Sequence, residues 1–265
     1  MKFPKVMGII NVTPDSFSDG GLFVNPDAAI AWGLKLLEDG ADILDIGGES
    51  TRPGSEPVEI TEELRRVLPV IEGIKKVRPD AVISIDTMKY EVATRAVEAG
   101  ATIINDVSGL QNDIRLATLA AEKNCTLVIM HMLGTPKTMQ INPTYQNVVE
   151  DIFNFLQSKI EIARQLGVKT IVADVGIGFG KTVEHNWELI RNIPRFYDLR
   201  VPLMIGISRK SFLGKTLQIE NPIDRDLPTL LLHSLLLNFN IDFIRVHNVK
   251  QFQLLRTLYQ KLYEN

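Results

Sequence analysis

The chain lacks the residues that several classes of protein require. Its 265 residues include a single cysteine, Cys125, which excludes a disulfide framework and a cysteine-rich metal site. The formal net charge of -3 gives no basic footprint for DNA or RNA, so we expect no nucleic-acid partner. No apolar run approaches the roughly 20 residues that a membrane span needs, and we expect no membrane partner either.

The N-terminal residues also lack the pattern of a signal peptide. The first apolar run begins at Val6, which leaves no room for a charged segment and an apolar segment before it. With one cysteine and no leader, the chain is expected to be cytoplasmic.

Short apolar runs rich in β-branched residues recur along the chain. Near-continuous apolarity is typical of strands that are buried on both faces of a parallel sheet. The eight runs are Val6–Ile10, Ile43–Ile46, Val82–Ile85, Thr102–Ile104, Leu127–Met132, Thr170–Ala173, Pro202–Ile207 and Phe243–Val246.

Segments with helical periodicity separate these runs. They are Asp27–Glu38, Thr61–Lys76, Tyr90–Glu98, Asp113–Lys123, Val148–Leu166, His185–Ile193, Leu230–Asn238 and Gln251–Tyr263. This alternation, with no break in composition, predicts one α/β domain over residues 1–265, a (β/α)8 TIM barrel. An open doubly wound sheet is the alternative, but no G-x-G-x-x-G motif follows the first run.

Polar residues follow the apolar runs at the points where the strands should end. In a barrel, Asn11, Asp86, Asn105 and Asp174 would all project into one mouth. Carboxylates and amides gathered in one pocket suit a polar heterocycle with ring nitrogens and an amino group. Each alone would also fit a turn or a helix cap, and His131 fits a satisfied interior histidine.

The last two strands add cationic residues. Arg245 and His247 are two apart and share a face of their strand, and Ser208 to Ser211 follow the seventh strand. The connections after strands seven and eight are the usual phosphate site of this fold, so we expect an anion there. A solvated surface pair of Arg209 and Lys210 is the alternative.

Two connections are longer than barrel loops usually are. Residues 12–26 follow the first strand and residues 47–60 follow the second, and loops of this length commonly cover a site. Gly20 and Gly21 give the first loop hinge freedom, and Arg52 in the second lies on a turn constrained by Pro53.

Seven motifs in order resemble one family. They are MGIINVTPDSFSDGG, DIGGESTRPG, SIDT, IIND, GIGFGK, SRKSFLG and RVHNV, and they span nearly the whole chain. Together they resemble the dihydropteroate synthases, which are pterin-binding barrels. The resemblance implies condensation of 6-hydroxymethyl-7,8-dihydropterin diphosphate with p-aminobenzoate and release of diphosphate.

The resemblance also implies a role for individual residues. The residues implied to bind the pterin are Asp86, Asn105, Met130, Asp174, Gly178 and Lys210, of which Asp86, Asp174 and Lys210 would be catalytic. Those implied to bind diphosphate are Asn11, Thr51, Arg52, Arg245 and His247, with Asn11 also contacting the Mg2+ that accompanies it. Those implied to shape the p-aminobenzoate site are Phe17, Asp19, Thr51, Pro53, Phe179, Lys210 and Ser211.

The residue chemistry is compatible with a dissociative substitution. Mg2+ and cations make diphosphate a good leaving group, and the pterin methylene cation that remains would be stabilised by Asp86 and Asp174. Because the aromatic amine is unprotonated at neutral pH, we expect neither a strong base nor a covalent intermediate. Cys125 is expected to be a small buried hydrophobic residue.

Three points remain open in the sequence. Val175 stands where the family usually has proline, and Pro228 with bulky leucines stands where relatives carry small residues. The altered stretch around Pro228 leaves a noncatalytic pterin-binding paralogue as an alternative function. A methyltetrahydrofolate-binding methyltransferase domain of the same barrel family is a second alternative, because it would share the Asp and Asn residues that bind pterin. The helix around Leu230–Leu237 is apolar almost all round, which fits either burial against the barrel or a homodimer interface, and the resemblance favours the dimer.

Overall fold

The fold is a closed barrel of eight parallel strands. The computed structural model describes residues 2–13 and 25–263. Each strand pairs with the next, and β8 returns to pair with β1. The strands are β1 (Lys5–Asn11), β2 (Ile43–Gly47), β3 (Ile83–Asp86), β4 (Ile103–Asp106), β5 (Thr126–Met130), β6 (Thr170–Asp174), β7 (Leu203–Ile205) and β8 (Phe243–Val246). The predicted (β/α)8 barrel is confirmed.

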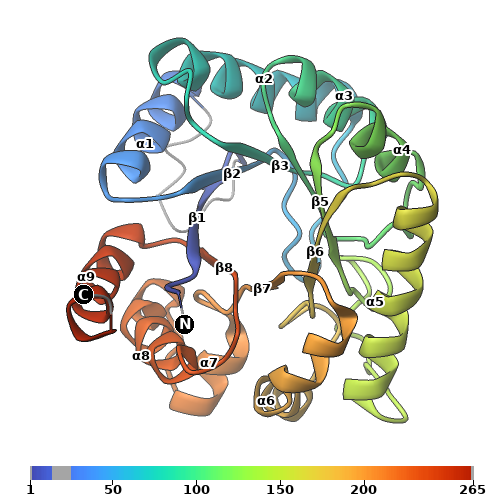
Figure 1. Ribbon diagram of the computed structural model, residues 1–265, viewed down its shortest axis with the longest axis vertical. Coiled ribbons are helices and arrows are strands. Elements are labelled where there is room, and N and C mark those ends of the chain that lie inside the picture. Colours follow the sequence, from blue (N-terminus) through green and yellow to red (C-terminus); the bar gives the residue numbers. More distant parts are fainter. Residues whose placement is uncertain (1, 14–24, 264–265) are drawn as a thin grey trace.

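Helices surround the strands as an outer ring (Figure 1). They are α1 (Pro26–Glu38), α2 (Ile60–Val77), α3 (Tyr90–Glu98), α4 (Arg115–Glu122), α5 (Val148–Gln165), α6 (Val183–Arg191), α7 (Ser211–Leu217), α8 (Asp226–Leu236) and α9 (Val249–Tyr263), with the 3-10 helices η2 (Ile193–Leu199) and η3 (Pro222–Arg225). Within the described ranges, no helix has both the length and the apolarity to cross a membrane.

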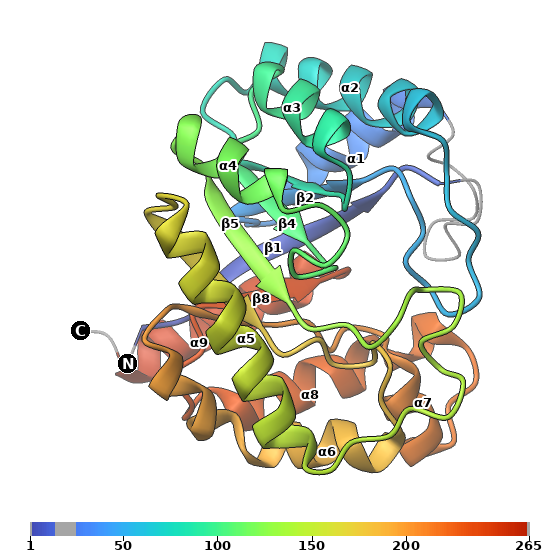
Figure 2. The same ribbon diagram turned by 90° about the vertical axis from the view of Figure 1, so that its right-hand side faces the viewer.

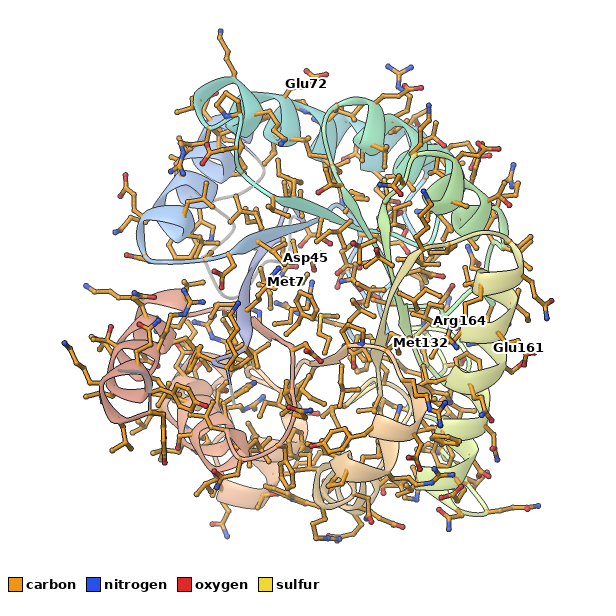
Figure 3. All side chains as sticks on the ribbon, in the orientation of Figure 1. Met7, Asp45, Glu72, Met132, Glu161 and Arg164 are labelled. Carbon is orange, nitrogen blue, oxygen red and sulfur yellow. The ribbon has the colours of Figure 1, made fainter. Side chains whose placement is uncertain are left out.

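Side chains alternate between the two faces of each strand. Those that point outward, such as Leu44, Ile46 and Ile85, are fully buried under the helices and belong to the main core. Figure 3 shows Met7 and Asp45 near the middle of the barrel, whereas Glu72 and Glu161 lie outside it on the helices. Burial on both faces explains the continuous apolar runs of the sequence.

The inside of the barrel is built in two layers. The lower layer is a separate apolar cluster of Met7, Ile43, Ile103, Val128, Val172 and Met204, with Phe243 packed against it. Side chains on the same face of a strand are two residues apart, so the next inward positions form the layer above. That layer is polar on four strands, where Asp45, Asn105, Asp174 and Arg245 stand two residues after Ile43, Ile103, Val172 and Phe243, whereas β1 and β5 contribute Ile9 and Met130. The apolar layer therefore closes the barrel beneath a polar floor.

The start of α8 differs from the prediction. The helix begins at Asp226 rather than Leu230, which places Pro228 in its first turn. Proline is tolerated there because the first N–H groups of a helix have no intrahelical acceptor. The short helices η2, α7 and η3 were not predicted, since segments of four to seven residues carry too little periodicity.

Cys125, His185 and His233 have structural roles. The thiol of Cys125 is buried and unbonded to another cysteine, and burial raises its pKa. His185 completes a capping box with Thr182 at the start of α6. His233 is buried in α8, where its Nδ1 lies 2.9 Å from the carbonyl oxygen of Thr229.

The connection after β6 packs directly on the end of β5 and needs glycine to do so. Gly176 has φ 68°, and a Cβ there would lie 1.9 Å from the carbonyl oxygen of His131. Gly54 also has positive φ, at 82°, but a Cβ there would have no atom within 4 Å. Alanine at Gly54 would therefore introduce backbone strain alone, whereas alanine at Gly176 would introduce both backbone strain and a steric clash.

Replacing these glycines by alanine should destabilise the chain to different degrees. We expect Gly176→Ala to lower the free energy of unfolding by about 3 kcal/mol or more, because strain and overpacking add. Gly54→Ala should cost only about 1–2 kcal/mol of strain. Urea unfolding of both variants measures the difference, and equal losses would contradict the close packing described at Gly176.

Candidate active site

A cavity of about 440 Å³ opens at the C-terminal ends of the strands, with lining residues from all eight strand ends or the connections that follow them. The structure brings together every predicted site residue that it describes: Asn11, Thr51, Arg52, Pro53, Asp86, Asn105, Met130, Asp174, Gly178, Phe179, Lys210, Ser211, Arg245 and His247. Phe17 and Asp19 lie outside the described residues. The placement agrees with the predicted mouth, while the individual roles stay predictions.

The floor of the cavity is organised by one guanidinium group. Arg245 on β8 donates from Nε to Oδ2 of Asp45 on β2 at 2.6 Å, and from Nη2 to Oδ2 of Asp86 on β3 at 2.7 Å. Asn105 on β4 donates its amide to the same Asp45 oxygen at 3.0 Å. Four strands are thus tied together above the apolar layer, through charge-assisted hydrogen bonds that are stronger than neutral ones.

Burial perturbs the two carboxylates that face the cavity. Desolvation, opposed by Arg245, raises the pKa of Asp86 to about 7. Desolvation also raises the pKa of Asp174, although the backbone N–H of Gly176 donates to its Oδ1 at 2.7 Å. Both groups therefore hold a proton more readily than an exposed aspartate, and a ligand with N–H donors would favour their ionised forms.

Lys210 lies against the glycine-rich connection after β6. Its Nζ lies 3.9 Å from the centre of the Phe179 ring, in cation–π geometry. A Cβ at Gly178 would come 3.0 Å from Cδ of Lys210, so glycine leaves room for the lysine stem. Burial, followed by the charge of Arg245, lowers the pKa of Lys210 to about 7. The lysine can therefore carry or release a proton near neutral pH.

His131 is an interior histidine, as expected, but its partner is a buried lysine. Nζ of Lys181 lies 3.0 Å from Nδ1 of His131 and 2.9 Å from the carbonyl oxygen of Phe179. Burial, and then the charge of Lys181, lowers the pKa of His131 to about 2, so the ring is neutral. The pair joins the end of β5 to the connection that carries Gly178 and Phe179.

The cationic side of the mouth is less charged than its sequence indicates. Burial, followed by nearby arginines, lowers the pKa of His247 well below its usual value, and its Nδ1 lies 2.9 Å from Oγ of Ser208. Arg209 makes a two-pronged ion pair with Asp226, at 2.6 and 2.9 Å. The expected positive charge of His247 is therefore wrong for the ligand-free chain, and so is the alternative of a solvated Arg209 and Lys210 pair.

Three residues that shape the site were not singled out from the sequence. Asp45 had a signal, because a carboxylate interrupts the apolar run Ile43–Ile46 at an inward position. Lys181 is the last residue of the GIGFGK motif, but nothing in the sequence indicates that its side chain is buried. Arg225 donates to the carbonyl oxygens of Ile219, Glu220 and Arg209, and no local pattern indicates such contacts.

A metal site made by the protein alone is not found in the part of the chain that is described. No group of three or more His, Cys, Asp or Glu side chains lies together there in a way that could hold an ion. Asn11, at the end of β1, lines the cavity and offers one amide oxygen.

The raised pKa of Asp86 gives stability a defined pH dependence. Between about pH 4 and pH 7 the folded chain keeps a proton on Asp86 that the unfolded chain has released, so the contribution of Asp86 to stability is lost as pH rises through this window. We compare the free energy of unfolding of the wild type with that of Asp86→Asn. The wild-type value minus the variant value should decrease as the pH rises from about 4 to about 7. Urea unfolding at several pH values measures this difference.

The matched control is Asp80→Asn, which removes an exposed carboxylate with a lowered pKa. Its difference from the wild type should stay flat from about pH 5 to pH 7, because both the folded and the unfolded chain have released the Asp80 proton there. A flat result for Asp86→Asn as well would mean that Asp86 is ionised throughout.

Comparison with known proteins agrees with this geometry. The family model "Pterin binding enzyme" matches residues 7–247. The dihydropteroate synthase of Haemophilus influenzae is 44% identical over 227 residues, which cover 85% of this chain and 81% of that protein. A Yersinia pestis dihydropteroate synthase in a sulfonamide drug complex superposes with TM-score 0.93 at 39% identity, covering 99% of this chain and 95% of that one.

A third relative was solved with a ligand bound. The Xanthomonas albilineans dihydropteroate synthase in complex with 7,8-dihydropteroate superposes with TM-score 0.87 at 39% identity, and the match covers 99% of this chain and 94% of that one. The closed barrel, the polar floor and these similarities lead to one assignment. The chain belongs to the pterin-binding enzyme family and, within it, to the dihydropteroate synthases.

Proposed function

We propose that this cavity condenses 6-hydroxymethyl-7,8-dihydropterin diphosphate with p-aminobenzoate and releases diphosphate. The observation that carries the proposal is a buried floor of carboxylate and amide groups in the same cavity as Arg245 and Lys210. Such a floor suits a flat heterocycle with several donors, and the cations suit the anionic group attached to it.

The pterin ring would lie on the polar floor. Oδ1 of Asn105 is buried without a hydrogen-bond partner among the described residues, so it can accept from a ring N–H or amino group. Asp174 and Asp86 would accept from the other donors, and Met130 and Gly178 would border the ring. Donors from the ring would lower the pKa of both carboxylates and favour the ionised state that the chemistry requires.

The diphosphate would lie towards β8 and the loop after β2. Arg245 keeps Nη1 without a partner among the described residues, while its other nitrogens hold Asp45 and Asp86. His247, Thr51 and Arg52 line the same cavity. An anion here would raise the pKa of His247 from its lowered value, so this histidine would gain its positive charge only with diphosphate bound.

Mg2+ would arrive with the diphosphate rather than occupy a protein-made site. Mg2+ commonly keeps waters and substrate phosphates as ligands and takes only one or two groups from the protein. The amide oxygen of Asn11 fits that requirement. The ion would neutralise negative charge on the leaving group.

The p-aminobenzoate would lie at the outer part of the cavity. Phe179 and Lys210 are already stacked there, and Thr51, Pro53 and Ser211 line the same opening. Lys210 would hold the carboxylate or the adjoining pterin, and the Phe179 ring would contact the aromatic ring. Phe17 and Asp19, outside the described residues, complete this group in the proposal.

The reaction would be a dissociative substitution. The C–O bond to diphosphate breaks first, and the electron pair leaves with the diphosphate. Asp86 and Asp174 stabilise the resulting pterin methylene cation through their negative charge. The aromatic amine then forms the new C–N bond and releases one proton to solvent. Nothing in this sequence requires a nucleophile from the protein, and the reaction is proposed to take place in the cytoplasm, where Cys125 stays reduced.

A diphosphate-release assay with the pterin diphosphate, p-aminobenzoate and Mg2+ tests the function. We expect release that depends on p-aminobenzoate, no pterin binding by Asp86→Ala, and nearly intact pterin binding but a raised KM for p-aminobenzoate in Phe17→Ala. Pterin binding without release would instead identify a noncatalytic paralogue. Equal loss of pterin binding in both variants would contradict the proposed division of the site.

The helices α8 and α9 carry an apolar surface that fits a second copy of the chain. Leu232 and Leu236 of α8 are buried, whereas the leucines at 227, 231 and 235 on α8 and at 254, 258 and 262 on α9 are between 54 and 72% exposed. Four-residue spacing aligns each set along one helix face, and the two helices are neighbours (Figure 1). We propose a twofold homodimer through this surface, since a single patch can then cover itself.

Analytical ultracentrifugation over a range of concentrations tests the dimer. We expect the wild type to sediment as a dimer and Leu235→Asp as a monomer, because the charge would be buried without a partner. Leu166→Asp is the control, as Leu166 is exposed at the end of α5, away from this surface. A wild type that stays monomeric at every concentration defeats the proposal.

A further inference from the structure

The loop after β2, residues 48–59, is closed at its base by its own side chains. Oε2 of Glu49 accepts the backbone N–H of Val58 at 2.9 Å, which joins the two ends of the loop. Within the loop, Ser55 donates from Oγ to the carbonyl oxygen of Ser50 at 2.5 Å. Thr51, Arg52 and Pro53 lie inside this closed segment and line the cavity. Their placement therefore depends on how the base is held.

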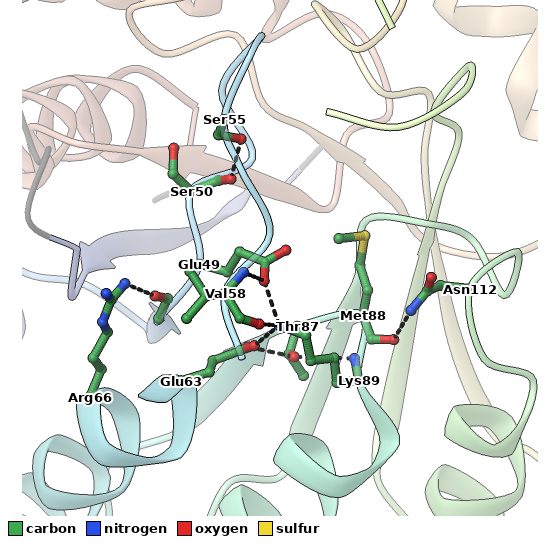
Figure 4. A network of polar contacts seen from close by, with 11 residues as sticks. Glu49, Ser50, Ser55, Val58, Glu63, Arg66, Thr87, Met88, Lys89 and Asn112 are labelled. Carbon is green, nitrogen blue, oxygen red and sulfur yellow. Dashed lines mark hydrogen bonds and ion pairs between the residues drawn. The ribbon is translucent and has the colours of Figure 1, made fainter. Parts of the chain in front are cut away.

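Lys89, from the connection between β3 and α3, holds that base. Its Nζ donates to the carbonyl oxygen of Val58 at 2.6 Å, to Oε2 of Glu63 at 2.5 Å and to Oε2 of Glu49 (Figure 4). An ammonium group has three donors, and all three are used. Figure 2 shows that this loop stands at the mouth end of the barrel, beside the loop after β5. Both ends of the loop therefore depend on one cation from another strand connection.

Glu63 extends the network to the cavity floor. It lies in the first turn of α2, is fully buried, and accepts the hydroxyl of Thr87 at 2.7 Å. Thr87 directly follows Asp86 in the chain, and its Oγ1 also accepts the backbone N–H of Lys89 at 3.2 Å. The base of the loop and the end of β3 are thus parts of one hydrogen-bonded unit.

The charges make Lys89 essential to this unit. Burial, the largest influence, raises the pKa of Glu63, while the hydrogen bond from Lys89 opposes that rise. Burial lowers the pKa of Lys89, but the hydrogen bonds that Lys89 donates to Glu49 and Glu63 outweigh this effect and raise the pKa. Without Lys89, two neighbouring carboxylates would share a largely buried site with no cation. Their repulsion would push the Glu49 side of the loop base away from α2.

We propose that Lys89 is a positioning residue that places Thr51, Arg52 and Pro53 over the cavity by locking the base of the 48–59 loop. It lines neither the cavity nor any predicted subsite, and it acts through Glu49 and Val58. The inference rests on the proposed function for its kinetic consequence. On the polar floor, Asp86 is held by Arg245 and Asn105 is bonded to Asp45. Lys89 should therefore influence p-aminobenzoate and diphosphate recognition while leaving recognition of the pterin ring unchanged.

Lys89→Met tests the proposal by steady-state kinetics and direct binding. We expect the KM for p-aminobenzoate to rise about tenfold to a hundredfold, as misplacement of binding groups by about 1 Å can produce. The Kd for a pterin without diphosphate, measured by calorimetry, should stay unchanged. Lys89→Arg should restore much of the KM, because it returns the cation. Lys35→Met is the control, since Lys35 makes only exposed ion pairs on α1.

Hydrogen exchange of the backbone separates failure of this inference from failure of the proposed function. In Lys89→Met, amides in residues 50–57 should exchange on the order of tenfold faster, whether or not the wild type releases diphosphate. If Lys89→Met does not fold, Lys89→Met with Glu63→Gln removes one of the two uncompensated charges and keeps an acceptor for Thr87. Unchanged exchange with an unchanged KM would overturn the proposal, and so would a loss of pterin affinity equal to the loss for p-aminobenzoate.

Discussion

The ion pairs of Arg245 with Asp45 and Asp86 are the interaction on which the rest of the site depends. Three carboxylates, Asp45, Asp86 and Asp174, are buried inside the closed barrel, and desolvation raises the pKa of Asp86 and of Asp174. The guanidinium of Arg245 bonds two of them at once through donors held in a rigid planar fork. Because Arg245 comes from β8 and its partners from β2 and β3, the pairs exist only when the strands close into a barrel. Closure of the fold and assembly of the floor are therefore one event.

Much of the fold and of the cavity floor could be predicted because both follow from regular repeats of apolar and polar residues along the sequence. Alternation of apolar runs and helical segments gave the barrel, and the polar residues at strand ends gave Asn11, Asp86, Asn105 and Asp174 around one cavity. The two-residue step of a strand explains part of this success, since Asn105 and Asp174 each stand one inward position above an apolar residue, Ile103 and Val172. Asp45 belongs to the same pattern, one inward position above Ile43.

The remainder could not be predicted because it depends on partners far away in the chain. The neutral state of His247 results from burial beside arginines of other segments, and the pairing of Arg209 with Asp226 results from where α8 begins. The Lys181–His131 contact joins residues 50 apart. Sequence shows the type of each side chain, whereas its charge state follows from burial and neighbours that only the folded chain defines.

The mouth of the barrel consequently has two parts, the floor and the loop of residues 48–59, and different interactions hold each of them in place. The floor is held by strands, and its groups are perturbed by burial, with the pKa of Asp86 raised and that of Lys210 lowered to about 7. The loop of residues 48–59 is held at its base by the contacts of Lys89 with Glu49 and Glu63. A heterocycle that offers donors to the carboxylates relieves the cost of burying them, so ligand binding and stability are coupled at the floor. At the loop the buried charges already have their partners, so its order is present before any ligand binds. Thr87, adjacent to Asp86 and bonded to Glu63, is the point at which the two parts meet.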